Sequence, residues 1–116
     1  MSDAELPIIR KVYDFILWYT PILNKLPRDH KFALGDLIIR GLHDLLEQLL
    51  IAQYEHNKLN RLVSLNSKLD ILRYQTRMLF DLKLFPVRRY DYAGQQLYSI
   101  GSDLGGWIKQ QRQPRK

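Results

Sequence analysis

Residues 62–79 of the chain read LVSLNSKLDILRYQTRML, and leucine or threonine returns every seven residues along two tracks. The tracks are Leu62, Leu69 and Thr76, and Leu65, Leu72 and Leu79. Such a heptad pattern is typical of a helix that packs lengthwise against other helices. We therefore predict a bundle helix over residues 58–84. It should end at Phe85-Pro86, because a proline disfavours the helical conformation of the residue before it.

Apolar residues at helical spacing predict three further helices, over residues 7–25, 30–55 and 91–111. Pro7 suits the first turn of the first helix, whereas Pro21 should kink that helix or break it near Thr20. Asp29 is the expected N-cap of the second helix. Because the connections are short, consecutive helices should be antiparallel. We predict an all-α, up-down-up-down four-helix bundle, with residues 1–116 as a single domain.

The predicted second helix has an unusually broad apolar face, made of two neighbouring stripes. The first stripe is Leu34, Ile38, Leu45, Leu49 and Ala52, and the second is Ile39, Leu42, Leu46 and Leu50. One bundle core would not cover both stripes. Either this helix is central in the fold, or the second stripe meets another subunit as an oligomer interface.

Two glycines of the predicted fourth helix, Gly101 and Gly105, are four residues apart and share one face. A glycine inside a helix costs up to ~1 kcal/mol relative to alanine. We therefore expect a neighbouring helix to approach closely at this face.

Composition limits the classes of function that the chain can serve. It has 116 residues and no cysteine, which excludes a disulfide framework, a thiolate metal site and a cysteine nucleophile. The first residues are acidic, unlike a secretory signal, and no apolar run approaches the ~20 residues that span a bilayer. We expect a soluble, cytoplasmic protein without membrane contact.

The net charge of +6 is distributed unevenly along the chain. Six basic and eight acidic residues precede Lys58, whereas twelve basic and four acidic residues follow from Lys58 onward. This asymmetry indicates either a polyanionic partner for the second half or a surface that favours solubility.

Residues for catalysis are lacking. The histidines His30, His43 and His56 have none of the spacings of a helical zinc or di-iron site, and there is no phosphate-binding loop of the Walker type. The carboxylate pair Asp44 and Glu47 should face outward on a helix, without the buried environment that tunes a catalytic acid. We therefore expect no enzyme activity, no cofactor and no metal.

A group of basic residues is the more promising feature. Arg73 and Arg77 are four residues apart, on one face of the predicted third helix. Arg61 and Lys68 should line an adjacent face, and Lys83, Arg88 and Arg89 extend the charge beyond the helix end. The tyrosines between them could stack on bases; they are Tyr74, Tyr90 and Tyr92.

An alternative interpretation is that Arg73 only pairs with Asp70, and Arg77 only with Asp81, on a solvated surface. Two acidic residues cannot neutralise seven basic ones, which favours recognition of phosphate or of a protein.

Three stretches of the sequence together are distinctive: YTPILNKLPRDHKFALG at residues 19–35, LDILRYQTR at residues 69–77 and IGSDLGGWI at residues 100–108. They resemble the accessory variability determinant (Avd) family of diversity-generating retroelements. This family belongs to a group of four-helix bundles that includes the 23S ribosomal RNA intervening-sequence proteins.

The resemblance implies a basic bundle that assembles into a ring-shaped homopentamer and binds RNA and DNA with little sequence preference. It also implies binding to the reverse transcriptase of the element, in support of copying template RNA into mutagenised cDNA (mutagenic retrohoming). Arg73 and Arg77 match the family's functional basic surface. The alternatives are a scaffold for protein interactions, or an intervening-sequence-type protein that associates with RNA and has no reverse-transcriptase partner.

Overall fold

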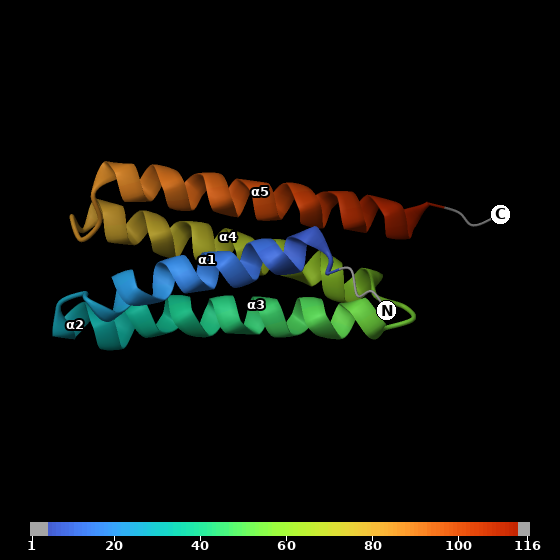
Figure 1. Ribbon diagram of the computed structural model, residues 1–116, viewed down its shortest axis with the longest axis horizontal. Coiled ribbons are helices and arrows are strands. Elements are labelled where there is room, and N and C mark those ends of the chain that lie inside the picture. Colours follow the sequence, from blue (N-terminus) through green and yellow to red (C-terminus); the bar gives the residue numbers. More distant parts are fainter. Residues whose placement is uncertain (1–4, 114–116) are drawn as a thin grey trace.

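The computed structural model describes residues 5–113. Four long helices, one short helix and a π-helical turn make up this part of the chain (Figure 1). Their bounds are α1 Pro7–Asn24, α2 Arg28–His30, η1 Lys31–Gly35, α3 Asp36–Tyr54, α4 Leu59–Asp81 and α5 Val87–Arg112. No strand occurs between residues 5 and 113, and the predicted all-α class is therefore confirmed.

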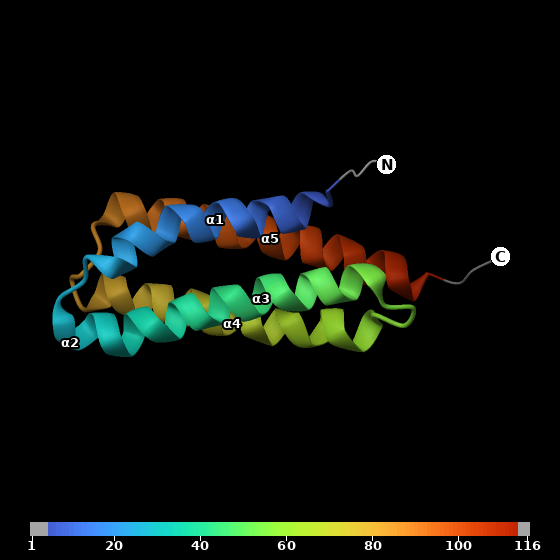
Figure 2. The ribbon, with the colours of Figure 1, turned by 60° about the horizontal axis from the view of Figure 1, so that its bottom comes forward.

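The long helices run alternately up and down a body of 54 × 27 × 22 Å. Helix α1 packs against α3 and α5, and α4 packs against the same two helices, so that α1 and α4 occupy diagonal corners (Figure 2). The α1–α3 and α4–α5 connections lie at one end of the bundle, and the α3–α4 loop lies at the other. This is the four-helix arrangement that the sequence predicted.

The heptad residues of α4 form the centre of the core. All six have side chains that are at most 2% exposed; they are Leu62, Leu65, Leu69, Leu72, Thr76 and Leu79. Burying a leucine side chain stabilises the fold by roughly 1.5–3 kcal/mol. The two-track leucine pattern therefore accounts for much of the packing of α4 against its neighbours.

Helix α1 continues through Pro21 and ends at Asn24, so of the two predicted alternatives, a kink or a break near Thr20, the break does not occur. Proline removes one helical hydrogen bond, the one that would reach the carbonyl of Leu17. Pro21 and Leu17 are both exposed, so water can hydrate that carbonyl. The Thr20 hydroxyl donates to the carbonyl of Ile16 at 2.7 Å.

The second predicted helix begins earlier and is interrupted. Pro27, not Asp29, is the N-cap of α2, and its carbonyl accepts from the N–H groups of His30 and Lys31 at 2.9 and 2.8 Å. Asp29 lies in the first turn and caps nothing with its side chain. The chain then passes through the π turn η1 before α3 starts.

Helix α5 begins at Val87, four residues earlier than predicted, and Pro86 is its N-cap. The Pro86 carbonyl accepts from the N–H groups of Arg89 and Tyr90 at 3.0 and 3.1 Å. Arg88 and Arg89 therefore belong to the first turn of α5, where the helix fixes their positions. None of the described helices has the length and apolar character that crossing a membrane requires.

Candidate nucleic-acid interface

Arg73 and Arg77 lie one turn apart on α4, beside α5. Together with Tyr74 and Tyr90 they line a shallow cavity of about 200 Å³. Tyr74 is largely exposed. The cavity thus places two guanidinium groups beside a free aromatic ring, and this is the combination that binds phosphate and base together.

The other two tyrosines are less free than the sequence suggested. Tyr90 stacks on Phe80, with 4.7 Å between ring centroids and 10° between planes. Tyr92 points toward α1, where its ring lies 4.6 Å from that of Trp18. Of the three tyrosines, Tyr74 is the one without an aromatic contact in residues 5–113, and its stacking on bases stays a prediction.

Arg73 is held in place by both α4 and α5. Its Nη1 atom is 2.8 Å from the Asp70 carboxylate, and its Nη2 donates to the carbonyl of Leu97 at 3.5 Å. A Cβ atom added at Gly101 would lie 2.5 Å from that Nη2. Gly101 thus makes room for an arginine side chain. A Cβ atom added at Gly105 would meet no neighbouring element within 4 Å, so the predicted close approach of a helix there is wrong within the protomer.

Arg77 pairs with Asp81 at 3.5 Å, and both side chains are 60% exposed. The ion pairs of the alternative interpretation, Arg73 with Asp70 and Arg77 with Asp81, are therefore both present. Exposed pairs of this kind contribute only ~0–1 kcal/mol. A phosphate group can replace such a carboxylate at small cost, so the pairs do not remove the two arginines from the candidate surface.

Arg61 and Lys68 are engaged on the other flank of α4, toward α3. Arg61 holds Glu55 through two hydrogen bonds of 2.8 and 2.9 Å and also contacts Gln48. These hydrogen bonds lower the pKa of Glu55. Lys68 Nζ lies 3.2 Å from the carboxylate of Asp44. Both cations, each 29% exposed, thus link α3, or the loop after it, to α4, and they are the predicted surface residues most engaged within the protomer.

Lys83, Arg88 and Arg89 are exposed at the end of the bundle where α4 turns into α5. Within residues 5–113, none of the three is within 4.0 Å of a carboxylate. Lys83 has φ 62°, in the left-handed region. Its N–H donates to the Phe80 carbonyl and that of Leu84 to the Leu79 carbonyl, which is the Schellman arrangement that usually takes glycine.

The α1–α3 connection brings three further cations to the same end of the bundle. They are Lys25, Arg28 and Lys31, and they too form no ion pair within the described range. We call this group of six the basic end: Lys25, Arg28, Lys31, Lys83, Arg88 and Arg89. Sequence reasoning missed the first three because they belong to the half of the chain with negative net charge. Only the folded topology shows that they join the others.

A family comparison matches residues 6–111 to the family described as bAvd-like. The chain belongs to the bAvd-like family. The resemblance to Avd proteins that the three sequence stretches indicated is therefore confirmed. No curated protein matches the chain.

The predicted interface stripe of this bAvd-like protein divides into three environments. Leu42 is 1% exposed within the core of the protomer and is unavailable to another chain; its assignment to an interface is wrong. Ile39 and Leu46 are half-buried against the core. Leu50 is 42% exposed and is the member most open to a partner.

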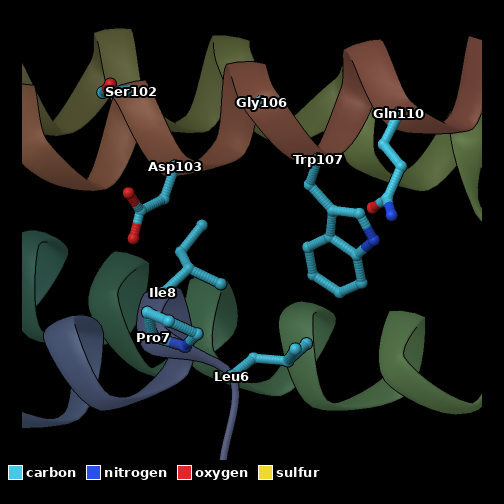
Figure 3. Close-up of a pocket in the computed structure, with 8 residues that line it drawn as sticks. All are labelled: Leu6, Pro7, Ile8, Ser102, Asp103, Gly106, Trp107 and Gln110. Carbon is cyan, nitrogen blue, oxygen red and sulfur yellow. The ribbon is translucent and has the colours of Figure 1, made fainter.

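A larger cavity, of about 420 Å³, lies between the start of α1 and the last turns of α5 (Figure 3). Trp107, Gln110 and Asp103 reach from α5 toward Leu6 and Ile8. Lys11 holds the Asp103 carboxylate, with its Nζ 3.0 and 3.1 Å from the two oxygens. Because the charged residue in the lining is acidic and already paired, this cavity does not suit a polyanion. The candidate interface lies elsewhere, along α4–α5 and at the basic end.

Proposed function

We propose that this bAvd-like protein is a non-catalytic, cytoplasmic accessory factor of a diversity-generating retroelement. In this proposal it binds template RNA and cDNA together with the element's reverse transcriptase, in support of mutagenic retrohoming. Membership of the bAvd-like family supports the link between this protein and a diversity-generating retroelement. The observation that supports nucleic-acid binding is the basic end, where six cations form no ion pair with any carboxylate of residues 5–113.

The mechanism would be electrostatic. Lysine and arginine side chains displace counterions that are condensed on phosphates, and the affinity then falls steeply as salt rises. The basic end and the Arg73–Arg77 cavity would together form the contact surface. Arginine adds bidentate hydrogen bonds to phosphate, which also fix the orientation of the strand.

The experiment is a binding titration of fluorescent RNA and DNA from low to moderate salt. We expect log Kd to rise linearly with log salt, with a slope set by the number of phosphates contacted. A flat response, or no binding at low salt, would contradict the proposal. The double variant Arg88→Gln with Arg89→Gln should lower both the affinity and the slope.

We also propose that the protomers assemble into a ring, with five copies as the family resemblance implies. Helix α4 has an exposed apolar stripe on the side away from the core: Val63, Ile71, Met78 and Leu82. Exposed apolar side chains also occur on α1 and α3, among them Tyr13, Leu17 and Leu50. Because α1 and α4 are diagonal, the two surfaces face different directions. If the α4 surface of one protomer contacts the α1–α3 surface of the next, the contact is head-to-tail. Repeated contacts of this kind close into a ring when the rotation between neighbouring protomers permits it.

Light scattering tests the assembly. We expect the mass of five chains for the unaltered protein and a single chain for Ile71→Lys, since a charge in the centre of the stripe disfavours burial. A monomeric unaltered protein would rule out the ring and leave the stripe of α4 for a different protein.

That stripe also favours a second candidate function, a scaffold that binds proteins only. Large exposed apolar surfaces mark sites of protein association. Capture of the reverse transcriptase after nuclease treatment, without any binding of naked RNA or DNA, would support the scaffold against the accessory factor. An intervening-sequence-type role would instead show RNA binding without capture of the enzyme.

A further inference from the structure

A π turn interrupts the regular helix between α1 and α3, at a position where an unbroken α-helix would direct a charged side chain toward the core. Lys31 precedes the fully buried Ile38 by seven residues, which is about two turns of an α-helix. An unbroken helix would therefore turn the Lys31 ammonium toward the core, where an unpaired charge is costly. The π turn η1 inserts a wider loop of backbone, in which the Asp36 N–H donates to the Lys31 carbonyl. Lys31 and Phe32 lie inside this turn, where Lys31 is half-buried and Phe32 is exposed.

The π turn also carries an exposed aromatic ring. Phe32 is 60% exposed, although phenylalanine is among the residues most often buried. Two cations lie over its ring: the Arg28 Cζ is 5.7 Å and the Lys31 Nζ 5.3 Å from the centroid. Within residues 5–113, neither cation forms an ion pair with a carboxylate. Asp29, which lies between them in the sequence, is exposed. π-Helical turns are frequent at functional sites.

A flat exposed ring with adjacent cations has the chemistry that single-stranded nucleic acid requires. The cations meet phosphates, while an unpaired base stacks on the ring whatever its identity. A duplex keeps its bases stacked on one another, so it can use the cations but not the ring. The segment lies at the same end of the bundle as Lys83, Arg88 and Arg89 (Figures 1 and 2). Charge at this end thus favours a polyanion over an apolar protein surface.

We propose that Phe32, flanked by Arg28 and Lys31, is a base-stacking site that gives the protein a preference for single-stranded over double-stranded nucleic acid. This inference rests on the proposed nucleic-acid binding. It adds a site on the α1–α3 connection to the surface on α4 and α5.

The test compares a single-stranded RNA of mixed sequence with a duplex of the same length, using fluorescence anisotropy over a range of salt. Phe32→Ala in the full chain should weaken single-strand binding by about 5- to 150-fold, the range that base–aromatic stacking implies. Duplex affinity should stay within about twofold. The salt slope should not change for Phe32→Ala, whereas Lys31→Gln should reduce it by ~0.7, because one phosphate contact is lost.

The matched control is Tyr54→Ala, which removes an aromatic ring that is 84% exposed near the opposite end of the bundle. It should leave both affinities unchanged. Phe32→Leu keeps an apolar side chain without the ring, so it separates stacking from folding if Phe32→Ala proves unstable. An equal loss for single strand and duplex, or no loss with Phe32→Leu, would overturn the inference. If Arg88→Gln with Arg89→Gln still weakens binding in that case, the proposed function stands without this site; absence of all binding would refute the proposed function itself.

Discussion

The hydroxyl of Tyr19 lies 2.8 Å from the hydroxyl of Thr76, and this buried hydrogen bond joins the diagonal helices α1 and α4 across the core. Both side chains are 1% exposed, so no water replaces either partner. Thr76 occupies a position of the heptad that leucine fills elsewhere. The pair is therefore a polar contact at the centre of an otherwise apolar interior. The contribution of this hydrogen bond to the free energy of unfolding can be measured by substituting each residue alone and both together.

Thr76→Val should destabilise the protein by ~1–3 kcal/mol, because the Tyr19 hydroxyl is then buried without a partner. Tyr19→Phe should have a cost of similar size, since it leaves the threonine hydroxyl unpaired. The double variant should cost less than the sum of the two, because no polar group remains to be satisfied. Urea denaturation of the four proteins measures this coupling, and strictly additive costs would show that the hydrogen bond contributes nothing.

Alkaline pH should also weaken the fold through Tyr19. Burial raises the pKa of Tyr19 well above its ordinary value of 10.0, although the Thr76 hydrogen bond acts in the opposite direction. Above pH 10 the unfolded state loses this proton while the folded state keeps it, so the free energy of unfolding falls by up to ~1.4 kcal/mol per pH unit. Stability from this group is fully present below pH 10. Urea unfolding of Tyr19→Phe and of the unaltered protein between pH 8 and 11 measures the contribution of Tyr19 ionisation to the pH dependence of stability. Parallel curves for the two proteins would contradict the expectation.

Arg73→Ala with Arg77→Ala should weaken RNA and DNA binding while changing stability little. The ion pairs with Asp70 and Asp81 are exposed and contribute only ~0–1 kcal/mol each. Anisotropy titrations at several salt concentrations, paired with thermal melts, measure both effects. Arg61→Ala is the matched control. It should lower the melting temperature by releasing Glu55 and Gln48, yet leave nucleic-acid affinity intact. A double variant that no longer folds would instead make the two arginines structural.

Lys83→Gly should stabilise the protein, because the residue stands at φ 62° in the left-handed region. That conformation costs a residue with a side chain roughly 1–2 kcal/mol, partly offset by the greater chain entropy of glycine. We expect a gain of up to ~1 kcal/mol in the free energy of unfolding, together with weaker nucleic-acid binding. Lys83→Asn tolerates the conformation and lacks the charge, so it should weaken binding as well. A more stable protein with unchanged affinity would show that Lys83 does not contact the ligand.

The sequence predicted the fold well where the signal was periodic and local. Leucines at heptad spacing are buried along α4, since spacing alone decides which face of a helix meets the core. The sequence predicted less where the helix geometry depends on which backbone groups remain hydrated in the folded protein. Neither the π turn before Asp36 nor the passage of α1 through Pro21 follows from spacing, because each depends on which backbone groups the fold leaves to water.

The candidate site was predictable only in part, for the same reason. Arg73 and Arg77 share a face by their spacing, and their local partners Asp70 and Asp81 could be named from the sequence. The engagement of Arg61 with Gln48, from a different helix, is a tertiary contact that no spacing rule gives. The convergence of Arg28 with Arg88 at one end likewise follows only from the order in which the helices pack.

The even number of long helices has a practical consequence for handling this protein. Four antiparallel passes return the chain to the side where it started, so the beginning of α1 and the close of α5 both lie opposite the basic end (Figure 1). A label attached beside the first turn of α1 or the last turn of α5 would therefore lie at the opposite end of the bundle from the basic end. Immobilisation through such a label would leave the six cations of the basic end facing the solution.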